Sequence, residues 1–497
     1  MRSSRLFRLI GLTFAATIAG AWLYPGGLGV YLLFTAVFFS ILYSGFFGGF
    51  QYSHCFLAVM WFIGFWLKLM VHFGSNAPYC EPVGSFDGSI TAWDGILLLA
   101  SVGGLGYLTG RLLLLPAVRV TKALPATIYL PWWYRPLRGP LWLSLVVVLI
   151  AIVITNQEMG LIVRGYVANV QLPWPLGGLF AWMTDIGLAL AISVLAAWDR
   201  ASGIGVVRGF VALCVEGAVL SVATLSRGLY FFHTLPAFAS EGPVFTTVRS
   251  RRRQIIMLLL TWLAVAVAIP LFSTGLRLVG AKAIPTSQAQ MDAETGALPP
   301  ETRTASIDPR CYASESWSGS AILRKSASIA RALVIDRWTG LEGLMATEAY
   351  VGRSTALFAE AAALRRGYGT VDIYTEKISA SGFTVSNAKK YHFATLAGPI
   401  AFFYFSGSCL VVFAGMTMLA ALMSMFEIAW TYLACDRLII AVSGGYLALV
   451  VLQLSGSAVQ GLTGPLSVTV FLAFAWFINR ISGANALQLR RRYRRDE

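Results

Sequence analysis

Long apolar runs separated by short polar connections make up most of the chain. About twelve of these runs approach or reach the roughly 20 residues that an α-helix needs to cross a bilayer. We expect spans near residues 6–23, 30–47, 55–73, 93–115, 141–155, 179–198, 206–225, 229–248, 255–272, 396–422, 438–454 and 466–481. The first run should be a retained span and not a cleaved signal peptide, because a second run follows after a short turn. The pattern therefore predicts an all-α, polytopic membrane protein.

Two runs depart from a simple crossing. The eighth run is interrupted around Arg227, and Pro236 and Pro243 would break a continuous helix. We therefore expect a broken or re-entrant segment there. The run over 396–433 is too long for one crossing, so a tilted or interfacial piece is predicted around Pro399, before the crossing itself.

Small residues predict one close contact between helices. Gly103, Gly106 and Gly110 recur at three- and four-residue spacing in the fourth run. Glycines at this spacing let another helix approach closely.

A long polar insertion, residues 276–390, separates nine predicted spans from the last three. Its apolar residues recur at helical spacing, and they include Ile322, Ile329, Leu333, Leu341, Leu344 and Met345. We expect a mainly helical, folded domain entered through a flexible linker at 284–304. The chain thus divides into an N-terminal transmembrane block at 1–275, the insertion at 276–390, and a C-terminal transmembrane block with a basic tail at 391–497.

The distribution of Lys and Arg predicts the side of the membrane on which each connection lies. Basic residues cluster in alternate connections, at 2–8, 119–138, 200–208 and 249–253, near Arg437 and at 490–495. Because such clusters stay in the cytoplasm, both termini are expected there. The insertion is then extracytoplasmic, together with the loops at 74–91 and 156–177. In a two-membrane bacterium the protein would lie in the inner membrane with its insertion in the periplasm.

Composition agrees with a membrane protein. The chain is 57% hydrophobic and has a mean hydropathy of +0.69, which is too apolar for a soluble protein. Its net charge of +15 comes from clusters at the ends of apolar runs. The sequence contains no basic stripe interleaved with stacking aromatic residues, so membrane lipids and not nucleic acid are the expected partners.

Familiar catalytic motifs are absent from the sequence. It has no phosphate-binding loop, no Gly-x-Ser-x-Gly elbow and no His-Glu-x-x-His pair. The four histidines, His54, His72, His233 and His392, are scattered, and no two have metal-ligand spacing. An Asp-x-Asp pair, which would hold a metal-bound nucleotide sugar, is also missing. We therefore expect neither a metal nor another cofactor.

Charged groups near the predicted outer face are the remaining candidate chemistry. A guanidinium fork matches two phosphate oxygens and stays charged, so arginines above an apolar groove would suit a lipid diphosphate. Arg227 interrupts an apolar run, where a charge is costly and usually functional. Lys68 has a structural explanation as well, because a long lysine side chain in an apolar run can extend its ammonium to the membrane interface. For Arg337 and Glu342 two roles stay open, a chemical one and an ion pair that holds the insertion together.

The layout of the chain resembles the Wzy-type O-antigen and repeat-unit polymerases and the related O-antigen ligases. Three stretches are similar to segments that this group places near its outer face, namely Phe65-Trp66-Leu67-Lys68-Leu69-Met70-Val71-His72, Leu225-Ser226-Arg227-Gly228 and Asp336-Arg337-Trp338-Thr339-Gly340-Leu341-Glu342-Gly343. The resemblance implies a metal-independent glycosyltransferase. Its donor would be a glycan on undecaprenyl diphosphate, its acceptor a sugar hydroxyl, and a chain-length regulator a further partner.

The resemblance also implies roles for named residues. Arg227 and Arg337 would hold the diphosphate, and Glu342 would be the base that deprotonates the attacking hydroxyl. Beside Glu342, Gly340 and Gly343 would let a substrate approach closely. Further contacts with the substrate are expected from Lys68, His72, Arg164, His233, Arg277 and Arg353.

Two other functions remain open at this point. A transporter or flippase of a lipid-linked sugar could use Glu216 and Asp185, two carboxylates within apolar runs, for coupling. The large insertion favours an enzyme, because a carrier needs no such cap. An O-antigen ligase-like transferase is the other alternative. In the predicted outer loops, Cys80 and Cys311 could form a disulfide or remain two free thiols.

Overall fold

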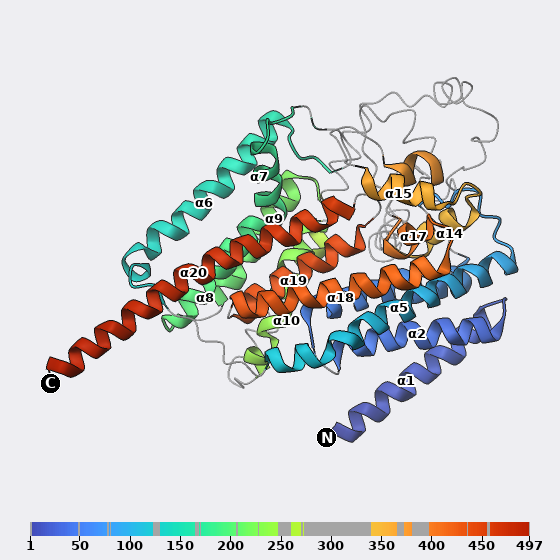
Figure 1. Cartoon of the computed structure of the whole chain (residues 1–497), viewed down its shortest axis with the longest axis horizontal. Coiled ribbons are helices and arrows are strands. Elements are labelled where there is room, and N and C mark those ends of the chain that lie inside the picture. Colours follow the sequence, from blue (N-terminus) through green and yellow to red (C-terminus); the bar gives the residue numbers. More distant parts are fainter. Residues whose placement is uncertain are drawn as a thin grey trace, which may run out of the picture. The chain divides into compact units, whose positions relative to one another are not determined.

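The computed structural model describes residues 2–47, 50–76, 79, 81–122, 130–164, 168, 170–204, 207–226, 228–246, 260–269, 272, 339–364, 372–379, 397–434, 436–454 and 458–496. Every regular element within these ranges is a helix (Figure 1). The all-α class is therefore confirmed for this part of the chain. The predicted linker at 284–304, and the insertion before Thr339, lie outside the described residues.

The chain divides into two compact units. Unit 1 comprises Met1–Leu115, Thr286–Ser424 and Val450–Gly461, and unit 2 comprises Pro116–Pro285, Met425–Leu449 and Leu462–Glu497. These units group residues by their contacts, whereas the division at 275 and 390 follows membrane topology. The topological division thus stays a prediction.

Unit 1 contains the first four predicted spans and the described helices of the insertion. Its elements are α1 (Arg2–Leu23), α2 (Leu28–Phe46), α3 (Tyr52–Trp61), η1 (Phe62–Leu67), α4 (Lys68–Ser75), most of α5 (Ile90–Lys122), α14 (Leu341–Ala349), α15 (Thr355–Ala363), η7 (Tyr374–Ile378), α17 (Pro399–Tyr404) and the first part of α18 (Cys409–Ala434). The elements η1 and η7 are π-helical, with hydrogen bonds to the fifth residue along.

Unit 2 is built around the middle of the chain. Its elements are α6 (Tyr134–Met159), α7 (Leu176–Trp182), the π-helical η2 (Met183–Gly187), α8 (Leu188–Ala201), α9 (Val207–Ala223), α10 (Leu229–Thr246), most of α19 (Arg437–Leu452) and most of α20 (Ala458–Asp496). Residues 260–269 are also helical.

Seven helices in the described part of the chain are long and apolar enough to cross a membrane. They are Leu28–Phe46, Tyr52–Ser75, Ile90–Val120, Tyr134–Met159, Leu176–Ala201, Cys409–Ala434 and Gly461–Ser482, and shorter apolar helices occupy Gly11–Leu23, Leu260–Ile269 and Arg437–Leu452. By length and composition this is a helical, membrane-embedded protein. The total of twelve spans and the sidedness of the loops stay predictions.

The close contact predicted from small residues is present between α5 and α18 in unit 1. A Cβ atom on Gly106 would lie 2.4 Å from the main-chain oxygen of Phe413, and one on Gly110 would lie 2.1 Å from that of Thr417. The Thr417 hydroxyl donates a hydrogen bond to the Gly106 carbonyl at 3.0 Å. Glycine therefore permits a backbone contact here that any side chain would block.

The predicted break in the eighth run is only partly correct. A non-helical turn does separate α9 from α10, and within it Leu225 adopts the left-handed region with φ +52°. The expectation that Pro236 and Pro243 break the following helix is wrong, because α10 continues past both. A Cβ atom on Gly445 of α19 would lie 2.4 Å from Pro236 Cγ. The missing side chain of Gly445 therefore lets α19 pack closely on the proline.

The predicted interruption around Pro399 is confirmed. The short helix α17 begins at Pro399, and a turn with φ +72° at Gly407 separates it from α18. The interfacial position of α17 stays a prediction.

Candidate functional site

A buried ion pair joins the third span to the insertion in unit 1. Lys68 Nζ lies 2.6 Å from Glu342 Oε1 and 2.8 Å from Oε2, so the ammonium donates to both carboxylate oxygens. The two side chains are 3% and 6% exposed. Because an unpaired charge in such a place would be very costly, each group stabilises the other.

Glycine contacts bring the two charges together. A Cβ atom on Gly340 would lie 1.8 Å from the main-chain oxygen of Gly64, which belongs to η1. Gly343 lies equally close to the backbone of Ala397, since its Cβ would be 2.1 Å from that carbonyl oxygen. The expectation that Gly340 and Gly343 leave room for a substrate is therefore wrong. Protein backbone already fills the space that their missing side chains leave.

The protein environment shifts the acidity of Glu342. Burial raises the pKa of this carboxyl above its ordinary value of 4.5, while Lys68 opposes the rise. Burial also raises the pKa of Tyr374, and the charges of Glu81 and Glu342 add to that effect. A carboxylate with a raised pKa is a better proton acceptor, so the site can support base chemistry.

His72, four residues after Lys68 in the chain, belongs to an aromatic cluster. Its ring centroid lies 4.3 Å from that of Tyr79 and 5.5 Å from that of Trp93, which is buried. Phe73 also contacts the ring of Trp93. The cluster fixes the end of α4 against the start of α5.

Arg353 offers the clearest open donor in the described part of the insertion. Its guanidinium carbon lies 4.9 Å from the centre of the Tyr404 ring. Its Nη1 atom is buried and has no hydrogen-bond partner among the described residues. A buried guanidinium nitrogen without a partner is costly, and it would bind an anion more strongly than a neutral acceptor.

The remaining described candidates lie in unit 2. Arg164 Nη2 donates to Asp185 Oδ1, and the main-chain nitrogen of Arg164 donates to the Thr224 carbonyl at 2.8 Å. His233 is buried, with Nδ1 2.8 Å from Glu216 Oε2. Its Nε2 lies 2.9 Å from the main-chain oxygen of Asp185, so both ring nitrogens contact protein groups.

The structure thus brings together only part of the predicted site. Within unit 1, Lys68 and Glu342 form a pair, and within unit 2, Arg164 and His233 both contact Asp185. The candidates Arg227, Arg277 and Arg337, and both Cys80 and Cys311, lie outside the described residues.

Sequence reasoning missed both partnerships. The open alternative for Glu342 was an ion pair with a nearby arginine, but its partner is Lys68, 274 positions away. The sequence did contain one indication of the pair, namely the desolvation cost of burying each charge without a partner. A lysine in an apolar run and a glutamate in an apolar segment both require a partner.

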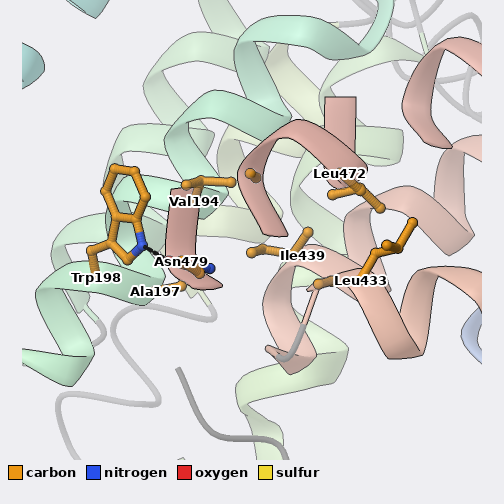
Figure 2. Close-up of a pocket in the computed structure, with 9 residues that line it drawn as sticks. Val194, Ala197, Trp198, Leu433, Ile439, Leu472 and Asn479 are labelled. Atoms are coloured by element: carbon orange, nitrogen blue, oxygen red, sulfur yellow. Dashed lines mark hydrogen bonds between the residues drawn. The ribbon is translucent and has the colours of Figure 1, made fainter. Parts of the chain in front are cut away.

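A small cavity in unit 2 does not serve as a substrate site. Figure 2 shows it among the side chains of Val194, Trp198, Leu433, Ile439 and Leu472, with Trp198 Nε1 donating to Asn479 Oδ1 at 2.9 Å. Its volume of about 10 Å³ is close to the smallest that holds one water molecule. No sugar fits there.

Comparison with known proteins gives no assignment, since the chain matches no family model, no curated protein and no solved structure.

Proposed function

We propose that this membrane protein is a metal-independent glycosyltransferase that polymerises oligosaccharide units carried on undecaprenyl diphosphate, at the outer face of a bacterial inner membrane. The buried Lys68–Glu342 pair carries the proposal. It brings a carboxylate of the predicted insertion against an ammonium of a predicted membrane span. Two charges kept at such a desolvation cost are typical of a functional site.

The donor diphosphate would compete with Glu342 for Lys68. Both are anions, and Lys68 holds both oxygens of the carboxylate. When the diphosphate takes the ammonium, Glu342 loses the partner that opposes the rise in its pKa. Donor binding would thus make the base stronger at the moment when it is needed.

The transfer step then follows ordinary acid–base chemistry. The oxygen of the acceptor hydroxyl bonds to the anomeric carbon, and the hydroxyl proton passes to Glu342. The bond from that carbon to the diphosphate breaks, and its electron pair leaves on the diphosphate. Lys68 and the open Nη1 of Arg353 would stabilise that charge, together with Arg227 and Arg337 as the resemblance implies.

A transporter or flippase of the same lipid-linked sugar is the second candidate. The observation in its favour is the buried contact between Glu216 and His233, because such groups within apolar helices are typical of ion pathways. It would move the donor between leaflets and leave its glycan unchanged.

The test is incubation of the purified full-length protein with an undecaprenyl-diphosphate-linked repeat unit, with a chelator and without nucleotide. We expect a ladder of products on a gel. A single addition would indicate a ligase-like transferase. An unchanged donor that crosses the bilayer of a vesicle would favour transport and refute the polymerase.

Matched variants connect the product to the site. Glu342→Gln should bind the donor and yield little product, since Gln keeps size and polarity but cannot accept the proton. Glu360→Gln is the control, because Glu360 pairs with Lys377 on the exposed surface of the same insertion. Near-normal turnover by Glu342→Gln would remove Glu342 from the mechanism.

A further inference from the structure

The hydrogen-bond partners of Glu216 and His233 show how many protons these two side chains share. His233 Nε2 lies 2.9 Å from the main-chain oxygen of Asp185. Because a carbonyl oxygen only accepts, Nε2 carries a hydrogen. On the other side of the ring, Nδ1 lies 2.8 Å from Glu216 Oε2. This contact needs one proton, since a bare nitrogen and a bare carboxylate oxygen cannot bond to each other.

The pair is therefore neutral in either of its two forms. One form is an imidazolium beside a carboxylate, and the other is an imidazole beside a carboxylic acid. Both side chains are buried, at 2% and 1% exposure for His233 and Glu216. A neutral pair is the arrangement that an apolar interior tolerates best.

One atom of the pair remains open. Glu216 Oε1 is buried and has no hydrogen-bond partner among the described residues. A proton added to Oε1 would break neither existing hydrogen bond. This oxygen is thus the position at which the pair can receive a second proton.

Asp185 connects the buried pair to solvent. Its main-chain oxygen accepts from His233, and its carboxylate, 32% exposed, accepts from Arg164. Asp185 lies in η2, and a π segment disturbs the α-helical pairing of main-chain carbonyls. One residue therefore contacts both the buried ring and the surface, on the side predicted to be extracytoplasmic.

We propose that Glu216 and His233 form a proton-binding site within the helices of unit 2. At rest the pair shares one proton between Nδ1 and Oε2. A second proton adds at Oε1 and gives an imidazolium beside a carboxylic acid, with a net charge of +1. The site stands with either function considered above, because neither side chain takes part in the proposed transfer step.

Few other titratable or charged groups face the pair from the described elements around it. Asp185 comes from η2 and Arg164 from the loop after α6. Cys214 of α9 and Tyr230 of α10 hydrogen-bond to each other. Tyr446 of α19 lies near enough to sense the charges of Asp185 and Arg164.

Infrared difference spectroscopy on the full-length protein in lipid nanodiscs tests the proposal. We expect acidification to produce the carbonyl band of a buried carboxylic acid, which shifts in heavy water. Glu216→Gln should lose this band and take up one proton fewer per chain. Glu158→Gln, which changes an exposed carboxylate at the end of α6, should keep it.

The wild-type spectrum alone can overturn the proposal. If no such band appears at any pH at which the protein stays folded, the site does not exist. A band that persists in folded Glu216→Gln would assign the proton to another group. If Glu216→Gln does not fold, His233→Gln serves instead. It retains the carboxyl and should move the band to a different pH, because the proton is no longer shared.

Discussion

Removing one charge from the Lys68–Glu342 pair should destabilise the protein far more than removing one charge from an exposed pair. In Glu342→Gln the Lys68 ammonium, whose side chain is 3% exposed, loses the negative charge of Glu342 beside it. Removing one partner of a buried ion pair typically costs about 3–5 kcal/mol. The control pair, Lys377 and Glu360, is 39% and 51% exposed, and exposed pairs contribute at most about 1 kcal/mol.

The assay is equilibrium unfolding of the full-length protein in mixed micelles, followed by helical circular dichroism. We expect Glu342→Gln and Lys68→Met each to lower the free energy of unfolding by about 3 kcal/mol or more. The double variant should recover most of that loss, because replacing both members of a buried pair is often nearly neutral. Catalysis is tested in the same samples. If Glu342 is the base, the double variant regains stability but stays inactive.

Two results would refute this reasoning. A loss below about 1 kcal/mol in Glu342→Gln, similar to that in Glu360→Gln, would show that the buried pair behaves like an exposed one. A double variant whose loss is the sum of the two single losses would show that the charges do not interact.

Two further predictions concern the glycine contact at Gly340 and the arginines of the predicted diphosphate site. Gly340→Ala should destabilise the protein by several kcal/mol, since its Cβ would lie 1.8 Å from a main-chain oxygen. The control Gly178→Ala should not, because nothing lies within 4 Å of its Cβ. Equal unfolding curves for the two variants would contradict this prediction. Arg227→Ala and Arg337→Ala should abolish polymer formation in protein that still folds. Arg227→Lys should restore little activity, because lysine lacks the bidentate fork of a guanidinium. Full activity of Arg227→Lys would argue against diphosphate binding by Arg227.

Helix positions could be predicted from the sequence because apolar runs of this length have few alternatives to a membrane helix. The break at Pro399 and the contact at Gly106 were also visible, since proline and glycine act locally. The helix around Pro236 was misjudged because a proline judged by itself does not reveal its packing against a distant residue, Gly445.

Partnerships between charges could not be predicted, because they join segments far apart in the chain. The order of residues gives no hint that Lys68 meets Glu342, or that the His233 ring reaches the Asp185 carbonyl. The π segments η1 and η2 were equally invisible, since both lie in runs that are apolar nearly throughout, where one extra residue in a turn leaves no visible change in the apolar pattern.

The π segment η1 also sets the direction in which Lys68 points. A π turn holds about one residue more than an α turn, and each residue of an α-helix rotates the chain by about 100° and advances it by 1.5 Å. Without that extra residue, the Lys68 side chain would start from a position rotated by about a quarter of a circle around the helix axis. Deleting one residue between Phe62 and Leu67 would therefore turn the ammonium away from Glu342 while every side chain in the site kept its identity. At this site the number of residues in one helical turn determines the direction in which a charged side chain points.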